Sequence, residues 1–397
     1  MSTTSDLSNS VRARYINDYV KWAKSLRVYD QFAMAISKDK EVLQNSSSVV
    51  LPYVGNMAIT AQTISETVDL PPQNVRDTTA SITPTSRGDG IQDSEKLLDQ
   101  NYTEYGKKRF EIIGENMIET LEALAIDSAL AGSMVQRAAA RASLDAGTST
   151  HRLTDAEFFK AAQRLKEHRC PGAMQDGLLV PSGHIAAMHG DAYFDVLQGG
   201  NINSILKYQD KNILYSGEVG ELGGFRLVVS PFAKVFGGAG IDNGTAGAYV
   251  MSAASESLEK ELSITTATHV AIGRYLTVGT EETASTFYPE NERVTHVSGT
   301  TTSVIVGGAS NGGLRYDHAN GTAVRNADSV YPVLFGGPSS LAKIYASDHG
   351  EYGEVVGPNK TGNAEQFVSL FWKWYGAYAI LNENWLVRGE YSSSLDA

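Results

Sequence analysis

Few residues in this sequence have the types and spacing that catalysis or metal binding requires. His184 and His189 lie five positions apart, whereas two histidines that share a metal on one face of a helix lie four apart. The single cysteine, Cys170, begins a CPG turn, and we interpret it as a small packing residue rather than a nucleophile. The glycines of GGAGIDNG at 237–244 do not have the G-x-G-x-x-G spacing of a dinucleotide loop. We therefore predict no catalytic residue, no cofactor and no metal site.

The net charge of −12 over 397 residues argues against a surface built to bind nucleic acid tightly, because such binding depends on Lys and Arg contacts with phosphates. An acidic balance would suit a wall that encloses DNA without adhering to it. No apolar run reaches the ~20 residues needed to span a bilayer, and the polar start MSTTSDLSNS does not have the pattern of a signal peptide. These features predict a folded protein that is cytosolic when made.

The clearest charged pattern is a row of glutamates within a long helical run at 103–142. Glu111, Glu115 and Glu119 recur at every fourth position and Glu122 continues the stripe, while apolar residues recur at spacings of three and four on another face. Neighbouring glutamates at this spacing repel each other by about 0.2–0.5 kcal/mol per pair. The row is therefore either a solvated face or a surface that meets basic residues of another subunit.

The segment before this helix predicts an extended hairpin. Residues 46–87 are rich in Thr, Ser, Ile and Val, and the Pro71-Pro72-Gln73-Asn74 break separates two strand-like runs. Arms of about a dozen residues would reach on the order of 40 Å, and their polar alternation offers no strongly apolar face to their own domain. Such a hairpin needs a partner chain; the alternative is a disordered Ser/Thr linker. Residues 88–102 then read as a Gly88-Asp89-Gly90 turn and a polar approach to the helix.

The remaining segments predict a mixture of helices and strands. Residues 10–43 combine basic and aromatic side chains, which we interpret as an arm that packs on a neighbouring molecule rather than on nucleic acid or membrane. HIAAMHGDAYFDVL, which starts at His184, reads as a short helix, and SGEVGELGGFRLVVSPF, which starts at Ser216, reads as a hairpin that turns at Gly223-Gly224. The aromatic run at 367–378 reads as a strand buried on both faces.

The order of these segments resembles the major capsid proteins of tailed bacteriophages, which have the Hong Kong 97-type fold. The glycine-turned strand GELGGFRLVVSP is the anchor of the resemblance. YPVLFGGPSSLAKIY at 331–345 resembles the strand-turn-helix of the podophage branch of that family, and residues 369–394 resemble its closing strands. No single motif is unique to the family, so the resemblance rests on the order of elements.

The resemblance implies an α+β fold with five parts. We expect an N-terminal arm, an extended β-hairpin loop, a long spine helix with the peripheral domain, an axial domain, and C-terminal strands that return to the peripheral domain. The expected bounds are, in that order, 1–48, 49–100, 101–150, 151–365 and 366–397. Residues 240–328 depart from the family pattern, and we interpret their Gly/Thr-rich, strand-like runs as a β-rich insertion in the axial domain.

The resemblance also implies a function without catalysis. Many copies would form the hexamers and pentamers of an icosahedral virion shell that encloses double-stranded DNA, assembled in the cytoplasm of a host bacterium. A separate scaffolding protein, a portal and decoration proteins are the partners that it implies. Some family members join a hairpin lysine to an asparagine of another chain, but this sequence has no lysine between Lys40 and Lys96, so we expect no such cross-link.

The hairpin of the family lies on the adjacent subunit, which implies contact residues here. The candidates are three hairpin charges, Glu66, Arg76 and Arg87, and the helical row of Glu111, Glu115 and Glu119. Two alternatives stay open at this point. One is an encapsulin-like bacterial compartment, which shares the fold. The other is a cytosolic hydrolase or transferase, whose carboxylates would be distant in sequence and converge in space.

Overall fold

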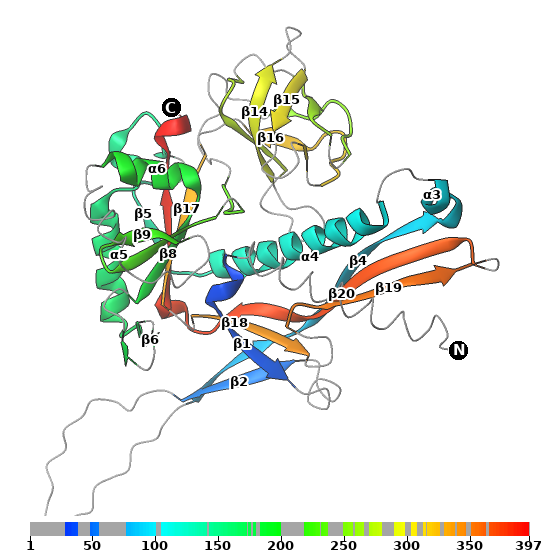
Figure 1. Cartoon of the computed structure of the whole chain (residues 1–397). Coiled ribbons are helices and arrows are strands. Elements are labelled where there is room, and N and C mark those ends of the chain that lie inside the picture. Colours follow the sequence, from blue (N-terminus) through cyan, green and yellow to red (C-terminus); the bar gives the residue numbers. More distant parts are fainter. Residues whose placement is uncertain are drawn as a thin grey trace, which may run out of the picture. The chain divides into compact units, whose positions relative to one another are not determined.

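The computed structural model divides the chain into two units (Figure 1). Unit 1 comprises Met1–Lys24, Met34–Ile118 and Leu341–Leu381, and unit 2 comprises Ser25–Ala33, Glu119–Ser340 and Asn382–Ala397. The structure describes residues 28–38, 48–54, 77–100, 105–140, 143–172, 174–175, 178–179, 183–199, 218–230, 232–236, 249–256, 259–265, 270–279, 290–297, 303–307, 313–314, 316–325, 329–337, 340–346, 351–362 and 365–396.

Unit 1 is built around one long strand, β20 (Phe367–Ile380), which pairs with β4 (Thr85–Ser94), β18 (Leu341–Ala346) and β19 (Glu354–Thr361) (Figure 1). The outer strand β1 (Ala33–Lys38) pairs with β18. Side chains alternate along β20 as the period of two requires: Trp372 and Trp374 are buried, whereas Phe371 is 44% exposed. The prediction of a strand buried on both faces is therefore wrong, because one face of β20 is open in this chain.

The predicted turn at Gly88-Asp89-Gly90 is also wrong, because these residues lie inside β4. The strand pairs with β20 from Thr85↔Gly376 to Ser94↔Phe367, and the short helix α3 (Glu95–Gln100) follows it. The glycines are needed for close approach rather than for turning. A Cβ at Gly90 would overlap the ring of Phe371, and one at Gly88 would lie 2.5 Å from the carbonyl oxygen of Trp372.

The base of the predicted hairpin is present as β2 (Val49–Val54) paired with β3 (Asp77–Ile82). Residues 55–76, which include the rest of the hairpin with Glu66 and Arg76, lie outside the described residues. At the base, Val49 and Ile82 are buried in one cluster with Ile344. The hairpin therefore does have an apolar attachment to its own unit, which the polar alternation of its sequence did not predict.

Helix α4 (Tyr105–Leu130) is the long helix of the chain, and it is shorter than the predicted run to 142. Residues up to Ile118 belong to unit 1 and residues from Glu119 to unit 2. After Leu130 the chain becomes the strand β5 (Val135–Arg137), which pairs in parallel with β21 (Leu386–Tyr391). The helix ends there because the backbone groups of 135–137 are committed to that sheet, and Gly132 lies in the break.

Unit 2 contains a six-stranded sheet in the order β5-β21-β17-β8-β10-β9. The bounds of its other strands are Tyr331–Gly336 for β17, His184–Met188 for β8, Phe225–Val229 for β10 and Glu218–Leu222 for β9. The helices α5 (Asp155–Glu167) and α6 (Gly190–Gln198) belong to this unit. One core cluster joins them to the sheet: it contains Phe158 and Leu165 of α5, Val196 of α6 and Phe225 of β10.

Three sequence predictions concern β8, α6 and the β9–β10 turn of unit 2 and the strand β18 of unit 1. The turn at Gly223-Gly224 is confirmed, since both residues have positive φ, 62° and 87°, between β9 and β10. The helix predicted from His184 is wrong in its first half, because β8 is a buried strand between β10 and β17 and the helix α6 begins at Gly190. The helix predicted at the end of 331–345 is also wrong, because Leu341–Ala346 is the strand β18, which pairs with β20.

A second six-stranded sheet of unit 2, which we call the 249–325 sheet, has the order β11-β16-β13-β14-β15-β12. Its strands are Tyr249–Val250, Ala323–Arg325, Tyr275–Val278, Glu290–Val297, Ser303–Gly307 and Glu261–Ser263 in that order. Its core cluster shares no residue with the core of the first sheet. The strand-rich character expected for 240–328 is observed, and its description as an insertion in an axial domain stays a prediction.

Two further short strands of unit 2, β6 (Met174–Gln175) and β7 (Leu178–Leu179), form a hairpin of their own. Among the described helices, none is long and apolar enough to cross a membrane.

Candidate assembly surfaces

The predicted contact residues that the structure describes lie on two elements. Arg87 is an exposed residue of β4, opposite Trp374 of β20. Glu111 and Glu115 are exposed on the part of α4 that belongs to unit 1, and Glu119 is half-buried at the start of the part that belongs to unit 2. Glu66 and Arg76 lie outside the described residues. The three glutamates therefore differ in burial: Glu111 and Glu115 are exposed, whereas Glu119 is half-buried.

Contacts with the sheet of unit 1 fix which face of α4 displays these glutamates. Nε of Arg109 lies 2.9 Å from a carboxylate oxygen of Asp93 on β4, and another guanidinium nitrogen donates to the carbonyl oxygen of Val368 at 3.2 Å. The indole nitrogen of Trp372 donates to Oδ1 of Asn116 at 2.7 Å. Arg109 is only 4% exposed. The helix is thus held by directional polar bonds as well as by apolar packing, which leaves Glu111 and Glu115 on its exposed side.

The outer face of the same sheet carries both apolar and charged side chains. Phe371 is 44% exposed and Phe367 is 38% exposed, on the face of β20 opposite the buried tryptophans. Lys373 pairs with Glu354 at 3.3 Å, and Lys360 pairs with Glu95 at 2.7 Å. Two exposed aromatic rings beside paired charges form a surface that could be covered by another protein chain.

Unit 2 contains a buried carboxylate that sequence reasoning missed as a functional group. Glu122 of α4 has no exposed area, and its two oxygens accept hydrogen bonds from the backbone N–H groups of Val28, Tyr29 and Asp30 at 3.0, 2.7 and 3.3 Å. Burial raises the pKa of Glu122 to about 7, and the three N–H groups act in the opposite direction.

This carboxylate holds the backbone of residues 28–30 against α4. Tyr29 and Phe32 are buried beside it, and Asp30–Phe32 form a short 3-10 helix. The interpretation of 10–43 as an arm that packs on a neighbour is therefore wrong for residues 28–38, which are built into this chain. A sequence signal was present: Ile118 and Ile126, four positions on either side of Glu122, are both apolar and both buried.

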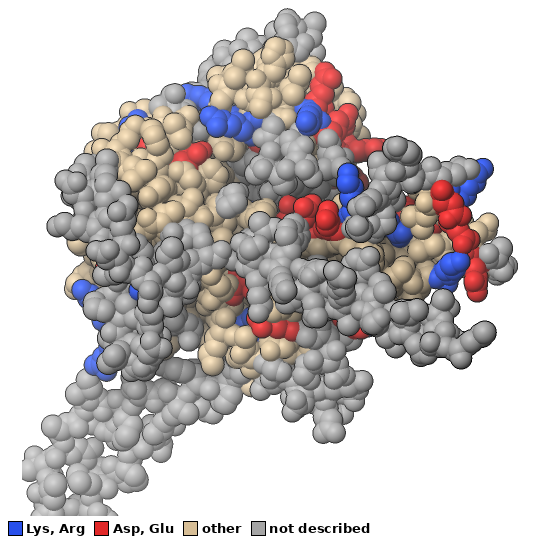
Figure 2. Space-filling model, viewed as in Figure 1, with Lys and Arg blue, Asp and Glu red and all other residues tan. Residues whose placement is uncertain are grey.

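The cysteine and two histidines singled out in the sequence have pKa values shifted by burial. Burial raises the pKa of the Cys170 thiol to about 11, which disfavours the nucleophilic thiolate. Burial lowers the pKa of the imidazoles of His184 and His189. Among the residues that the structure describes, no group of three His, Cys, Asp or Glu side chains could hold a metal ion. Figure 2 shows Lys and Arg lying beside Asp and Glu over the described part of this face rather than in one extended basic area.

Comparison with solved structures identifies the fold. No protein-family model matches the chain, and no curated protein matches it in sequence. The structure is similar to that of the capsid of Ralstonia phage GP4, with a TM-score of 0.56 and 8% sequence identity, over 91% of this chain and 87% of that chain. The chain has a phage capsid fold. The similarity to tailed-phage capsid proteins that the sequence predicted is thus confirmed at the level of the fold.

Two looser similarities involve another phage capsid and a bacterial compartment. The capsid of the cyanophage P-SCSP1u aligns with a TM-score of 0.49 and 12% identity, over 93% of this chain and 89% of that chain. The holo-SrpI encapsulin complex from Synechococcus elongatus PCC 7942 aligns with a TM-score of 0.46 and 10% identity, over 92% and 86%.

Proposed function

We propose that this chain is a major capsid protein, a structural protein rather than an enzyme, that assembles into the hexamers and pentamers of an icosahedral virion shell. The observation that carries the proposal is the capsid fold itself, which extends over 91% of the chain. The net charge of −12 agrees with a shell that encloses double-stranded DNA without binding it tightly. Assembly takes place in the cytoplasm of a host bacterium, with a separate scaffolding protein, a portal and decoration proteins as partners.

The proposed contacts between copies lie in residues 10–27 and 39–100 and on α4. The hairpin, whose base is β2 and β3, lies on the adjacent subunit and brings Glu66 and Arg76 to it. Arg87 of β4 belongs to the same contact region. Glu111, Glu115 and Glu119 meet basic residues of another copy, which would remove the repulsion within the row. The β-rich 249–325 sheet is an addition to the axial domain.

Electron microscopy of the purified chain, expressed with and without a scaffolding protein, tests this function. We expect closed shells of uniform size when scaffold is present and DNA inside particles taken from infected cells. Monodisperse monomers under all conditions would overturn the proposal. Shells that contain a cargo enzyme and no DNA would assign the chain to the encapsulin-like alternative.

The absence of a lysine in the hairpin gives a second test on the same particles. Because residues 41–95 contain no lysine, hairpin cross-links of the lysine–asparagine type cannot form. We expect this chain, whose 397 residues have a mass of 42.7 kDa, to run as one monomer band when mature particles are analysed on a reducing denaturing gel. A ladder of covalent oligomers would contradict this expectation without touching the shell function.

A further inference from the structure

The 249–325 sheet is joined to the rest of unit 2 by a narrow neck. The chain enters after Phe236 and returns before Val330, and these two residues form a bridge: the N–H of each donates to the carbonyl oxygen of the other, at 2.8 and 2.9 Å. The two sheets of unit 2 have separate core clusters. A two-stranded neck leaves the orientation of the sheet it carries to other contacts, so the question is which residues supply them.

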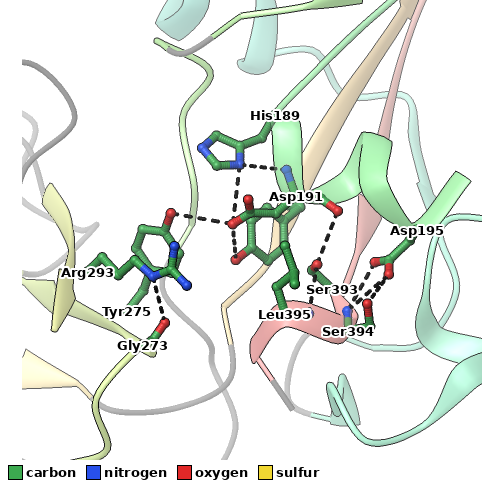
Figure 3. A network of polar contacts seen from close by, with 10 residues as sticks. His189, Asp191, Asp195, Gly273, Tyr275, Arg293, Ser393, Ser394 and Leu395 are labelled. Atoms are coloured by element: carbon green, nitrogen blue, oxygen red, sulfur yellow. Dashed lines mark hydrogen bonds and ion pairs between the residues drawn. The ribbon is translucent and has the colours of Figure 1, made fainter. Parts of the chain in front are cut away.

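One carboxylate oxygen supplies such a contact at the N-terminus of α6 (Figure 3). Oδ2 of Asp191 lies 3.4 Å from the hydroxyl of Tyr275, on β13 of the 249–325 sheet, and 3.3 Å from the hydroxyl of Tyr331, on β17 of the first sheet. The rings of the two tyrosines meet edge to face with centroids 6.3 Å apart. Tyr275 also packs against the core of the first sheet. Tyr275 of the 249–325 sheet thus packs against the core of the first sheet, and its hydroxyl contacts the same carboxylate, Asp191, as that of Tyr331.

His189 caps the helix that carries this carboxylate and is itself kept neutral. Its Nδ1 accepts a hydrogen bond from the backbone N–H of Asp191 at 3.2 Å, which makes it the N-cap of α6. Its ring meets that of Tyr275 edge to face at 6.4 Å. Burial lowers the pKa of His189; Asp191 opposes this, and the charge of Arg293 on β14 adds to it. A neutral imidazole is the form that can accept the N–H.

Charges from the 249–325 sheet support the contact from its own side. Nε of Arg293 donates to the carbonyl oxygen of Gly273 at 3.1 Å, which fixes the turn that leads into Tyr275 (Figure 3). The neighbouring Arg274 attracts the carboxylate of Asp145 in the first part of unit 2. Hydrogen bonds from Gly147 and Thr148 lower the pKa of Asp145 most, and Arg274 lowers it further. Residues 273–275 therefore present the hydroxyl of Tyr275 to Asp191 and the charge of Arg274 to Asp145.

The platform under the contact is fixed by the C-terminal residues. The backbone N–H of Ser394 donates to both oxygens of Asp195, at 3.2 and 3.1 Å, and the hydroxyl of Ser394 bonds to the same carboxylate. The hydroxyl of Ser393 donates to the carbonyl oxygen of Asp191 at 3.2 Å (Figure 3). Helix α6 is thus held while its Asp191 side chain reaches outward, so the moving partner in any opening would be the 249–325 sheet.

We propose that Asp191 is the anchor of a reversible latch, in which Tyr275 fixes the orientation of the 249–325 sheet and can release it without unfolding. The contact between Tyr275 and Asp191 crosses the junction between the two sheets, and at 3.4 Å it is long for a hydrogen bond from a hydroxyl to a carboxylate. The contact of Tyr331 with the same oxygen does not cross the junction. Opening the Tyr275 contact costs less than unfolding a sheet with a core of its own. The latch turns about the Phe236–Val330 neck. It is a property of the single chain and does not depend on the capsid proposal.

Distance measurement by pulsed electron resonance tests the latch in the full-length chain. Spin labels are attached at Lys260→Cys, directly before β12, and at Gln198→Cys on α6, two exposed positions, in a Cys170→Ser background. Labelled chains are diluted into unlabelled ones, so that distances within one chain are measured even in an assembly. The parent should give one narrow distance. Tyr275→Phe and Asp191→Ala should each lower the ratio of docked to open chains about tenfold, because each removes a hydrogen bond that involves a charged group.

A matched control and a folding readout make the result decisive. Tyr193→Phe removes a hydroxyl from α6 itself, outside the network of Figure 3, and should leave the distance unchanged. Hydrogen exchange within β14 and β15 should stay slow in all variants. Unchanged distances in both latch variants, a broad distribution in the parent, or rapid exchange throughout β14 and β15 in the variants would each overturn the latch.

Discussion

The two halves of α4 carry the same residue type in opposite surroundings. In the half that belongs to unit 1, Glu111 and Glu115 are exposed, and the helix is held to its sheet by a buried cation, Arg109. In the half that belongs to unit 2, Glu122 is fully buried and holds the backbone of residues 28–30. The carboxylates of the first half are open to solvent, whereas Glu122 of the second half binds backbone N–H groups of its own chain.

The difference in burial shows that glutamates at similar spacing along α4 can have two different roles. A buried carboxylate with three N–H donors is satisfied within the chain and has little to offer a partner. Exposed carboxylates that repel one another gain from a basic partner. We therefore assign Glu122 to the stability of the subunit and keep Glu111 and Glu115 as the candidates for contacts between copies.

Replacement of Glu122 should have the largest effect on stability. In Glu122→Ala, three backbone N–H groups lose their acceptor in a buried site, which should lower the free energy of unfolding by about 3–5 kcal/mol. Glu111→Ala is the matched control on the same helix and should change it by less than ~0.5 kcal/mol. Urea unfolding followed by circular dichroism measures both. Equal losses of stability in the two variants would show that Glu122 and Glu111 do not differ in their contribution to folding.

The stability of the protein should also depend on pH through Glu122. The pKa of this carboxyl is about 7 in the folded chain against an ordinary value of 4.5, so the folded state binds the proton more tightly than the unfolded state. The contribution is complete below pH 4.5 and is lost as the pH rises through 7. It amounts to on the order of 3 kcal/mol.

Unfolding experiments at pH 4.5 and pH 8 compare the parent with Glu122→Gln, which does not titrate. The parent should lose more stability between the two pH values than the variant. The same pH dependence in the parent and the variant would show that the pKa of Glu122 is the same in the folded and the unfolded chain, and that burial does not raise it.

Removal of the cation in the first half of α4 should have a smaller effect than removal of Glu122. Arg109→Ala leaves Asp93 without its ion pair and the carbonyl oxygen of Val368 without that donor. We expect a loss of about 2–3 kcal/mol, because Asp93 lies nearer the surface than Glu122 and water can reach it. Lys108→Ala, at the adjacent exposed position, is the control for helix propensity. A loss below 0.5 kcal/mol would show that apolar packing alone holds this half.

Charge reversal in the displayed row should leave the subunit intact and act on assembly. Glu111→Lys with Glu115→Lys should change the free energy of unfolding by less than ~0.5 kcal/mol, since both positions are exposed. The yield of closed shells should fall, because two repulsive contacts replace attractive ones at each boundary. Sedimentation separates shells from free subunits. An unchanged shell yield would exclude these glutamates as contact residues.

The sequence carries the parts of the fold that depend on local pattern. The alternation in 367–378 predicts a strand, the paired glycines 223 and 224 predict a turn with positive φ, and the recurrence of Ile113, Met117 and Leu121 predicts α4. Their order along the chain was enough to indicate the capsid fold, which similarity to a solved capsid then confirmed.

The errors occur where distant segments decide the structure. Gly88 and Gly90 resemble a turn in isolation, and only the pairing of β4 with β20 makes them part of a strand. His184–Met188 is an apolar run that could form either a helix or a strand, and pairing with β10 and β17 decides for the strand. Glu122 shares the spacing of an exposed stripe, and its burial depends on residues 28–30 reaching it from far away in the sequence.

The central claim is that function lies on boundaries between copies of this chain, and a cryo-electron microscopy reconstruction of assembled particles tests it most directly. We predict hexamers and pentamers in which Glu111 and Glu115 face basic residues of a neighbouring copy, while Glu122 still accepts the N–H groups of residues 28–30 of its own chain. A chain that forms no particles, or particles in which both exposed glutamates face solvent and Glu122 binds a neighbour, would contradict the account.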